Sequence, residues 1–122
     1  MESKQLRLGN YVNYEQTNHI ITSINIDFTV SVWVDNNSTE HLYTHQNNEL
    51  KPILLTEEWL LNFGFDNTKW GYLLDRDYCF DIKEMKFKIQ GNFEFETLKE
   101  IKYVHELQNL VFILTDNELK IN

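Results

Sequence analysis

The stretch Ile101–Leu114 constrains the fold more than any other, because it is the densest apolar segment of the chain. Its first part predicts a helix over about 100–109, with an apolar stripe at helical spacing formed by Ile101, Val104, Leu107 and Val111. Its second part, residues 110–115, is a short apolar run that suits a buried strand as well as a continued helix. Either structure must be covered by the preceding chain, so we expect this stretch to lie in the core.

Length and composition predict a single domain spanning residues 1–122. A chain of this length is one domain in size, and 42% hydrophobic residues with 14% aromatics are enough for a packed core. The chain contains no alanine, the best helix former, while β-branched and aromatic residues are plentiful. This composition favours strands over helices.

Period-two patterns in the first part of the chain predict a strand meander over residues 5–44. Apolar residues alternate along 19–26 and again along 28–34. The turn-forming Asp, Asn and Ser residues at 35–38 then lead into a return strand at 40–44.

We expect this meander to pack with a helix and a C-terminal sheet within residues 50–122. Thr56 can cap a helix over 56–63, and Gly64 can end it in a left-handed conformation. The strands expected after this helix are 70–74, 78–82, 85–89 and 93–96. Residues 111–121 resemble a closing hairpin if 110–115 is a strand. The predicted fold class is α+β, with a mainly antiparallel sheet, curled or split in two, and two short helices.

The charge distribution argues against several classes of partner. The formal net charge is −8, and no Lys or Arg lies between Leu8 and Leu50. Nucleic acid and anionic membrane surfaces are therefore disfavoured as partners, because both require clustered cations. Cys79 is the single cysteine, and the polar segment Met1–Arg7 does not resemble a signal peptide. We expect a cytoplasmic protein in which Cys79 is a small buried hydrophobic residue.

Two groups of side chains are candidates for ligand binding. His105, Gln108 and Asn109 offer convergent hydrogen-bonding groups of the kind that ligand pockets use. The alternative for His105 is a structural contact with a neighbouring loop. The aromatic candidates are Trp33, Trp70 and Tyr72, which can stack on a ligand or form a protein-binding patch. Trp33 is expected to be exposed, since it opposes the apolar face of its strand.

Catalytic and metal-binding patterns are weak. His41 and His45 have the spacing of a helical metal site, but their segment resembles loop or strand, where the two rings do not converge. The carboxylates of Asp75, Asp77 and Asp81 can serve acid–base chemistry or simply form a charged hairpin tip. We predict no metal site and no cofactor, and we leave enzymatic activity open while favouring a non-enzymatic protein.

Three segments, 6–12, 52–65 and 101–110, carry a family resemblance. In their order and spacing they resemble an uncharacterised family of small proteins of gut-type bacteria, their mobile elements and phages. The resemblance implies a phage or mobile-element setting and no assigned activity.

Two functions are consistent with these features. The first is a small acidic non-enzymatic interaction protein that binds a host protein. The second is a small-molecule binder, for example a counter-defence protein that sequesters a nucleotide signal. The sequence leaves the oligomeric state open.

Overall fold

The structure is a computed structural model that describes residues 7–14, 17–24, 30–33, 42–45 and 51–121. The chain divides into two compact units. The first is built from the ranges Met1–Leu54 and Tyr103–Glu118, and the second from Leu55–Lys102 and Leu119–Asn122. The single domain over 1–122 stays a prediction. The α+β fold class is confirmed, because the described residues form two antiparallel sheets and two helices.

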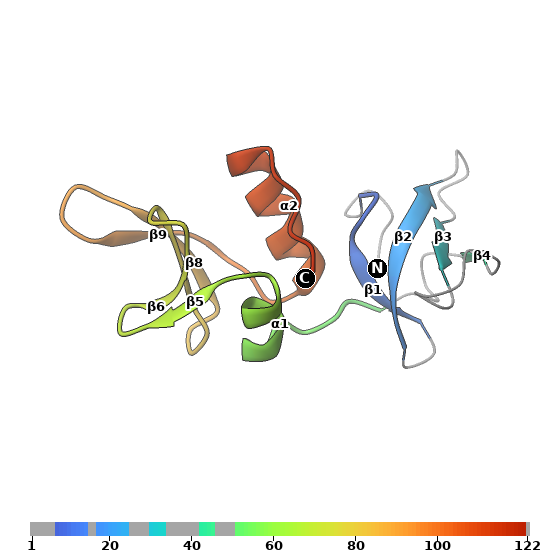
Figure 1. Cartoon of the computed structure of the whole chain (residues 1–122), viewed down its shortest axis with the longest axis horizontal. Helices are drawn as coiled ribbons and strands as arrows, with labels where there is room; N and C mark the ends of the chain where they lie inside the picture. Colours follow the sequence, from blue (N-terminus) through green and yellow to red (C-terminus); the bar gives the residue numbers. More distant parts are fainter. Residues whose placement is uncertain (1–6, 15–16, 25–29, 34–41, 46–50, 122) are drawn as a thin grey trace. The chain divides into compact units, whose positions relative to one another are not determined.

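The sheet of the first unit contains four strands in sequence order, each antiparallel to its neighbour (Figure 1). They are β1 (Tyr11–Tyr14), β2 (Thr17–Ile24), β3 (Val30–Trp33) and β4 (Leu42–His45). The meander expected over 5–44 is present in these strands, and the turn expected at 35–38 lies outside the described residues. Pairing of Tyr11 with Ile20 and of Ser31 with Thr44 sets the register.

Helix α2 (Val104–Thr115) belongs to the same unit and contacts β1. It begins later than the predicted 100–109 and continues through 110–115, so the strand alternative and the closing hairpin over 111–121 are wrong. The helix continues because its apolar stripe keeps helical spacing, with Val104, Leu107 and Val111 all buried. Asp116 ends it in a left-handed conformation, where its backbone N–H donates to the Phe112 carbonyl at 2.8 Å.

The second unit begins with helix α1 (Glu57–Asn62), which confirms the helix predicted at 56–63. Thr56 is the N-cap residue, and its hydroxyl accepts a hydrogen bond from the Trp59 backbone N–H. Gly64 follows the helix with φ of +96°, the left-handed conformation expected of it. The helix is short, so packing of Leu60 and Phe63, both buried, stabilises it more than helix propensity does.

The sheet of the second unit contains five antiparallel strands in sequence order. They are β5 (Asp66–Thr68), β6 (Gly71–Leu74), β7 (Tyr78–Asp81), β8 (Lys86–Gln90) and β9 (Phe95–Glu100). The middle three match the predicted strands within a residue. β5 was not predicted, and β9 differs from the predicted 93–96 because the preceding turn extends to Glu94.

An aromatic row forms the core face of this sheet. Tyr72 pairs with Phe80, and Phe80 pairs with Phe87, so the three rings lie side by side across β6, β7 and β8. All three side chains are buried. Because side chains alternate along a strand, Leu73 and Cys79 face the opposite side of the sheet.

Within the described residues, neither helix is long and apolar enough to cross a membrane.

Candidate functional site

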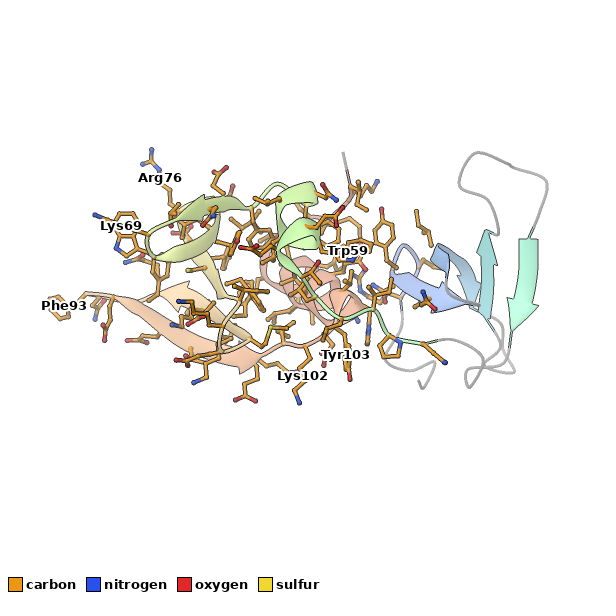
Figure 2. All side chains as sticks on the ribbon, turned by 90° about the horizontal axis from the view of Figure 1, so that it is seen from below. Trp59, Lys69, Arg76, Phe93, Lys102 and Tyr103 are labelled. Carbon is orange, nitrogen blue, oxygen red and sulfur yellow. The ribbon has the colours of Figure 1, made fainter. Side chains whose placement is uncertain are left out.

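Two exposed aromatic side chains mark one end of the second unit. Trp70 is 62% exposed and Phe93 is 99% exposed, although aromatic side chains are ordinarily used to fill a core. Both line a groove of about 380 Å³, together with Leu73, Arg76, Gln90, Glu94 and Phe95. We call these seven residues the Trp70 surface. Figure 2 shows Phe93 and Arg76 projecting at this end of the unit, away from Trp59 of α1.

The strand register explains why this groove forms on the face opposite the aromatic row. Leu73 follows Tyr72 and therefore points to the other side of β6. Gln90 lies three residues after Phe87, so its side chain is on the same face of the sheet as Leu73. Gln90 pairs directly with Phe95 of β9. The groove thus lies over the second face of the sheet, where Leu73 and Phe95 are only half-buried.

The turn that presents Phe93 depends on Gly91. The backbone N–H of Gly91 donates to the Glu94 carbonyl at 2.8 Å, which closes the turn between β8 and β9. A Cβ atom at Gly91 would lie 2.6 Å from the Glu94 carbonyl oxygen and 2.8 Å from Oε1 of Glu96. Only glycine fits this close approach, so Gly91 allows the tight turn that leaves Phe93 in solvent.

The backbone of Trp70 is held on both sides by hydrogen bonds. Its N–H donates to Oγ1 of Thr68 at 3.2 Å, and its carbonyl accepts a hydrogen bond from Sγ of Cys79 at 3.2 Å. Cys79 is fully buried, as predicted, and burial raises the pKa of its thiol. The neutral thiol therefore remains a donor to Trp70, and the exposed indole extends from a fixed backbone.

Trp70 also lines a second hollow, which has a volume of about 350 Å³ and is more polar. Besides Trp70 it is lined by Glu57, Lys69, Tyr72, Asp81 and Lys83, among others. We call it the polar hollow. Trp70 is the side chain shared by the two depressions, so a ligand that crosses Trp70 can contact both.

The two carboxylates of the polar hollow are already bound by the protein. The Tyr72 hydroxyl donates to Glu57, and this hydrogen bond raises the pKa of the Tyr72 phenol. Oδ1 of Asp81 accepts hydrogen bonds from the backbone N–H groups of Lys83 and Glu84, at 3.0 and 3.2 Å. Burial acts to raise the pKa of Asp81, but these N–H groups and the ammonium of Lys88 lower it overall.

Three cationic side chains also lie around Trp70 and the two depressions. Lys69 lies over the Trp70 ring, with Nζ 4.7 Å from the ring centroid. Lys83 lines the polar hollow and Arg76 lines the groove. Among the described residues, none of the three forms an ion pair. Carboxylates lie beside them, because Glu94 lines the groove and Glu57 and Asp81 line the polar hollow.

The predicted residues Gln108 and Asn109 form contacts within the first unit. Gln108 is fully buried, its carbonyl accepts from the Tyr11 backbone N–H at 2.9 Å, and its amide donates to the Gly9 carbonyl at 3.0 Å. The Asn109 carbonyl accepts from Nε of Arg7 at 2.8 Å and from the amide of Asn10 at 2.9 Å. These bonds hold the turn before β1 against α2, which accounts for the polarity of this helix face without a ligand.

His105 lies on the same helix but differs from its neighbours. It is 4% exposed, and its ring stacks on Tyr103 with centroids 6.1 Å apart. Among the described residues, its Nδ1 atom is buried with no hydrogen-bond partner. Burial lowers the pKa of His105, which keeps the ring neutral. The expected loop contact is therefore not seen at Nδ1.

The remaining predicted residues fall in separate places. Tyr72 is buried in the aromatic row, with its hydroxyl at the polar hollow, and Trp70 is the exposed centre described above. The backbone of Trp33 lies in β3, but its side chain is outside the described part of the structure. His41 and the side chain of His45 are also outside it. In the part described, no group of three or more His, Cys, Asp or Glu side chains could hold a metal ion.

The acidic residues of the β6–β7 region are divided between a turn and the end of a strand. Asp75 and Asp77 are exposed in the turn before β7, whereas Asp81 is the last residue of that strand. The rise of a strand places Asp81 about 13 Å along the chain from Asp77. The charged hairpin tip is therefore the interpretation that the structure favours.

The sequence interpretation missed Phe93, Arg76 and Lys69 as surface residues of one site. Phe93 was assigned to a strand, although it directly follows the turn-forming Gln90-Gly91-Asn92 segment. An aromatic residue within an extended turn was the available signal, because such a position cannot pack in a sheet. The grouping of Trp70, Arg76 and Phe93 around one groove depends on strand pairing, which the sequence does not specify.

No family model, no curated protein and no solved structure matches this chain. The family resemblance of the segments 6–12, 52–65 and 101–110 therefore stays a prediction.

Proposed function

We propose that this chain is a non-enzymatic interaction protein that binds a protein partner through the Trp70 surface. The observation that carries the proposal is the exposure of Trp70 and Phe93 beside a groove of about 380 Å³. Exposed aromatic side chains with an adjacent arginine are the composition found at the centres of protein interfaces. Burying both rings in a complex would remove a large apolar area from water, which favours association.

The fixed backbone of Trp70 supports the same proposal. A side chain whose backbone is held by Thr68 and Cys79 loses less conformational freedom on binding than one on an unrestrained loop. The resemblance to proteins of phages and mobile elements supports a host protein as the partner, encountered in the cytoplasm.

A small-molecule binder is the second candidate function, and the polar hollow favours it. Its volume of about 350 Å³ is within the range of small-ligand sites, and Trp70 and Tyr72 line it. A nucleotide that binds there would raise the melting temperature, because the ligand stabilises only the folded state. A thermal-shift screen with nucleotides tests this, and a flat response to all of them removes the candidate.

The protein-binding function is tested by affinity capture from a bacterial lysate with matched baits. The wild-type chain is compared with a Trp70→Ala/Phe93→Ala double variant. The control bait is Ile113→Ala, since Ile113 is also 76% exposed but lies on α2. Circular dichroism and melting curves establish that all three baits are folded.

We expect one or more proteins to be enriched by the wild type and by Ile113→Ala, and to be lost with the double variant. The proposal is wrong if every protein captured by the wild type is retained by the double variant, or if the wild type enriches none.

A further inference from the structure

We infer that strand β9 pairs with β9 of a second copy of this chain, antiparallel and about a two-fold axis at Thr97. In this register Glu96 of each copy lies beside Lys99 of the other copy. The result is a symmetric dimer whose two five-stranded sheets join edge to edge. This inference goes beyond the proposed function, because it uses neither Trp70 nor Phe93.

The backbone of β9 presents a free edge. β9 is the last strand of its sheet, and residues 96–100 are all exposed. The Gln90 N–H donates to the Asp77 carbonyl at 2.8 Å, away from β9, so the paired residue Phe95 directs its own backbone groups to the open edge. The alternation of an antiparallel ladder does the same for Thr97 and Glu100. Such unpaired groups are a template for another strand.

A β-bulge adjusts the spacing of these outward groups. β9 contains one extra residue, Leu98, at the point where its register with β8 shifts. Because of this bulge, the step from Thr97 to Glu100 spans the same length of β8 as the step from Phe95 to Thr97. A two-fold axis at Thr97 therefore aligns the outward groups of Phe95 with those of Glu100 in the second copy.

Two opposite charges on β9 have no partner within their own sheet. Lys99 is paired with Phe87 and Glu96 with Ile89, so both charged side chains lie on the face of the aromatic row and opposite apolar residues. Among the described residues, neither Glu96 nor Lys99 forms an ion pair. Each can therefore still be neutralised by another molecule.

The third charge of the strand is already compensated. Glu100 lies opposite Lys86 of β8. The pKa of Lys86 is raised chiefly by Glu84, and Glu100 adds to this effect. What β9 offers at its edge is thus one free carboxylate and one free ammonium group, which makes the strand complementary in charge to itself.

The positions of these two charges select the partner and the register. With the axis at Thr97, the contact between Glu96 and Lys99 forms twice, and the two Thr97 side chains form a favourable cross-strand pair. Moving the axis by one position along the strand places Glu96 opposite Glu96, or Lys99 opposite Lys99, and like charges directly opposite are destabilising. Charged residues ordinarily protect an edge strand from pairing, but here they attract in one antiparallel register.

Charge reversal in the full chain tests the inference, with sedimentation equilibrium over a series of concentrations as the measurement. We expect the wild type to dimerise, and Glu96→Lys and Lys99→Glu each to weaken the dimer by about tenfold or more, because like charges replace both attractive contacts. An equal mixture of the two variants should dimerise like the wild type, since each introduced charge then faces its opposite. Recovery in the mixture also shows that both variants are folded.

The matched controls are Glu58→Lys and Lys120→Glu, because both residues are exposed and lie outside β9. Neither should change the dimer. The inference is overturned if the wild type stays monomeric throughout the series, if the β9 variants dimerise as well as the controls, or if the mixture dimerises no better than its components.

A cysteine at the axis tests the register itself. Directly opposed residues of a hydrogen-bonded pair have Cα atoms about 5.5 Å apart, within the range that a disulfide spans. In a glutathione buffer, Thr97→Cys should form a disulfide-linked dimer, whereas Asn62→Cys, an exposed position at the end of α1, should not. Equal cross-linking of the two variants, or none of Thr97→Cys, contradicts the axis at Thr97.

Discussion

Both carboxylate oxygens of Glu118 are bound by the guanidinium of Arg7, with Nη1–Oε2 and Nη2–Oε1 distances of 3.0 and 3.1 Å. The same guanidinium lies 4.4 Å from the centroid of the Phe112 ring, and its Nε donates to Asn109. The side chains of Arg7 and Glu118 are 29% and 23% exposed, so water screens this pair less than an ordinary surface pair. Arg7 therefore joins the start of the first unit to α2 and to the residues after it.

Replacing Arg7 by alanine should destabilise the first unit by about 2 kcal/mol, because several charge-assisted hydrogen bonds are lost together. Hydrogen exchange of the α2 amides measures this effect within the unit concerned. Arg76→Ala is the control, since Arg76 is exposed and forms no ion pair with the described residues, and we expect a change below about 0.5 kcal/mol. Equal exchange rates in the two variants would show that the Arg7 contacts contribute little.

Gln108→Leu should destabilise the first unit by about 2 kcal/mol, because one buried and one part-buried backbone group lose their hydrogen bonds to the Gln108 amide. These groups are the N–H of Tyr11 and the carbonyl of Gly9. Asn62→Leu serves as the matched amide replacement, since Asn62 is exposed at the end of α1. Urea unfolding followed by circular dichroism measures both variants. A Gln108→Leu protein as stable as Asn62→Leu would mean that the amide of Gln108 is dispensable.

His105 should make the stability depend on pH. Burial lowers its pKa below the ordinary value of 6.5, and the nearby Glu106 carboxylate acts in the opposite direction. The unfolded chain therefore binds a proton more readily than the folded chain. The contribution of neutral His105 is complete above pH 6.5 and is lost as the pH falls from there toward the lower folded-state pKa.

The check is a series of unfolding curves between about pH 7.5 and 5.5, for the wild type and for His105→Phe. Phenylalanine preserves a ring that can stack on Tyr103 and removes the buried Nδ1 atom without a partner. We expect the variant to lose less stability than the wild type on acidification. Parallel pH profiles would show that His105 does not titrate differently in the folded state.

Gly91→Ala should open the turn between β8 and β9, because the new Cβ would lie 2.6 Å from the Glu94 carbonyl oxygen. We expect a lower melting temperature and weaker partner binding, since Phe93 would be displaced from the groove. Asn92→Ala is the control within the same turn, because Asn92 is exposed. If Gly91→Ala melts and binds like Asn92→Ala, the close approach at Gly91 is unimportant.

The sequence predicted the secondary structure correctly in segments with one clear pattern, either helix-end signals or the alternation of apolar residues along a strand. Helix α1 was marked by a capping threonine and a terminal glycine, and strands β6 to β8 by alternation. Residues 110–115 stayed ambiguous because a short apolar run fits a helix and a strand equally well. The structure resolves them as helix because Val111 continues the buried stripe of Val104 and Leu107.

Features that depend on pairing between distant segments were not predictable in the same way. Strand β5 has the polar sequence Asp66-Asn67-Thr68 and forms because it pairs with β6. The ligand-binding cluster at Gln108 stays a prediction, and the internal partners of Gln108, Gly9 and Tyr11, lie far earlier in the chain. Trp70 was a candidate by residue type alone, and its grouping with Phe93 required the sheet.

The central claim is that protein partners contact the Trp70 surface, and site-specific photocross-linking tests it most directly. Phe93 is replaced by p-benzoyl-phenylalanine in one protein and Ile113 in a second, and both are irradiated in the same bacterial lysate. We predict that the protein with the photo-reactive residue at position 93 forms discrete covalent adducts with a partner protein. We predict that none of the same adducts form when that residue is at position 113. No adduct from Phe93, or the same adducts from both positions, would contradict the claim.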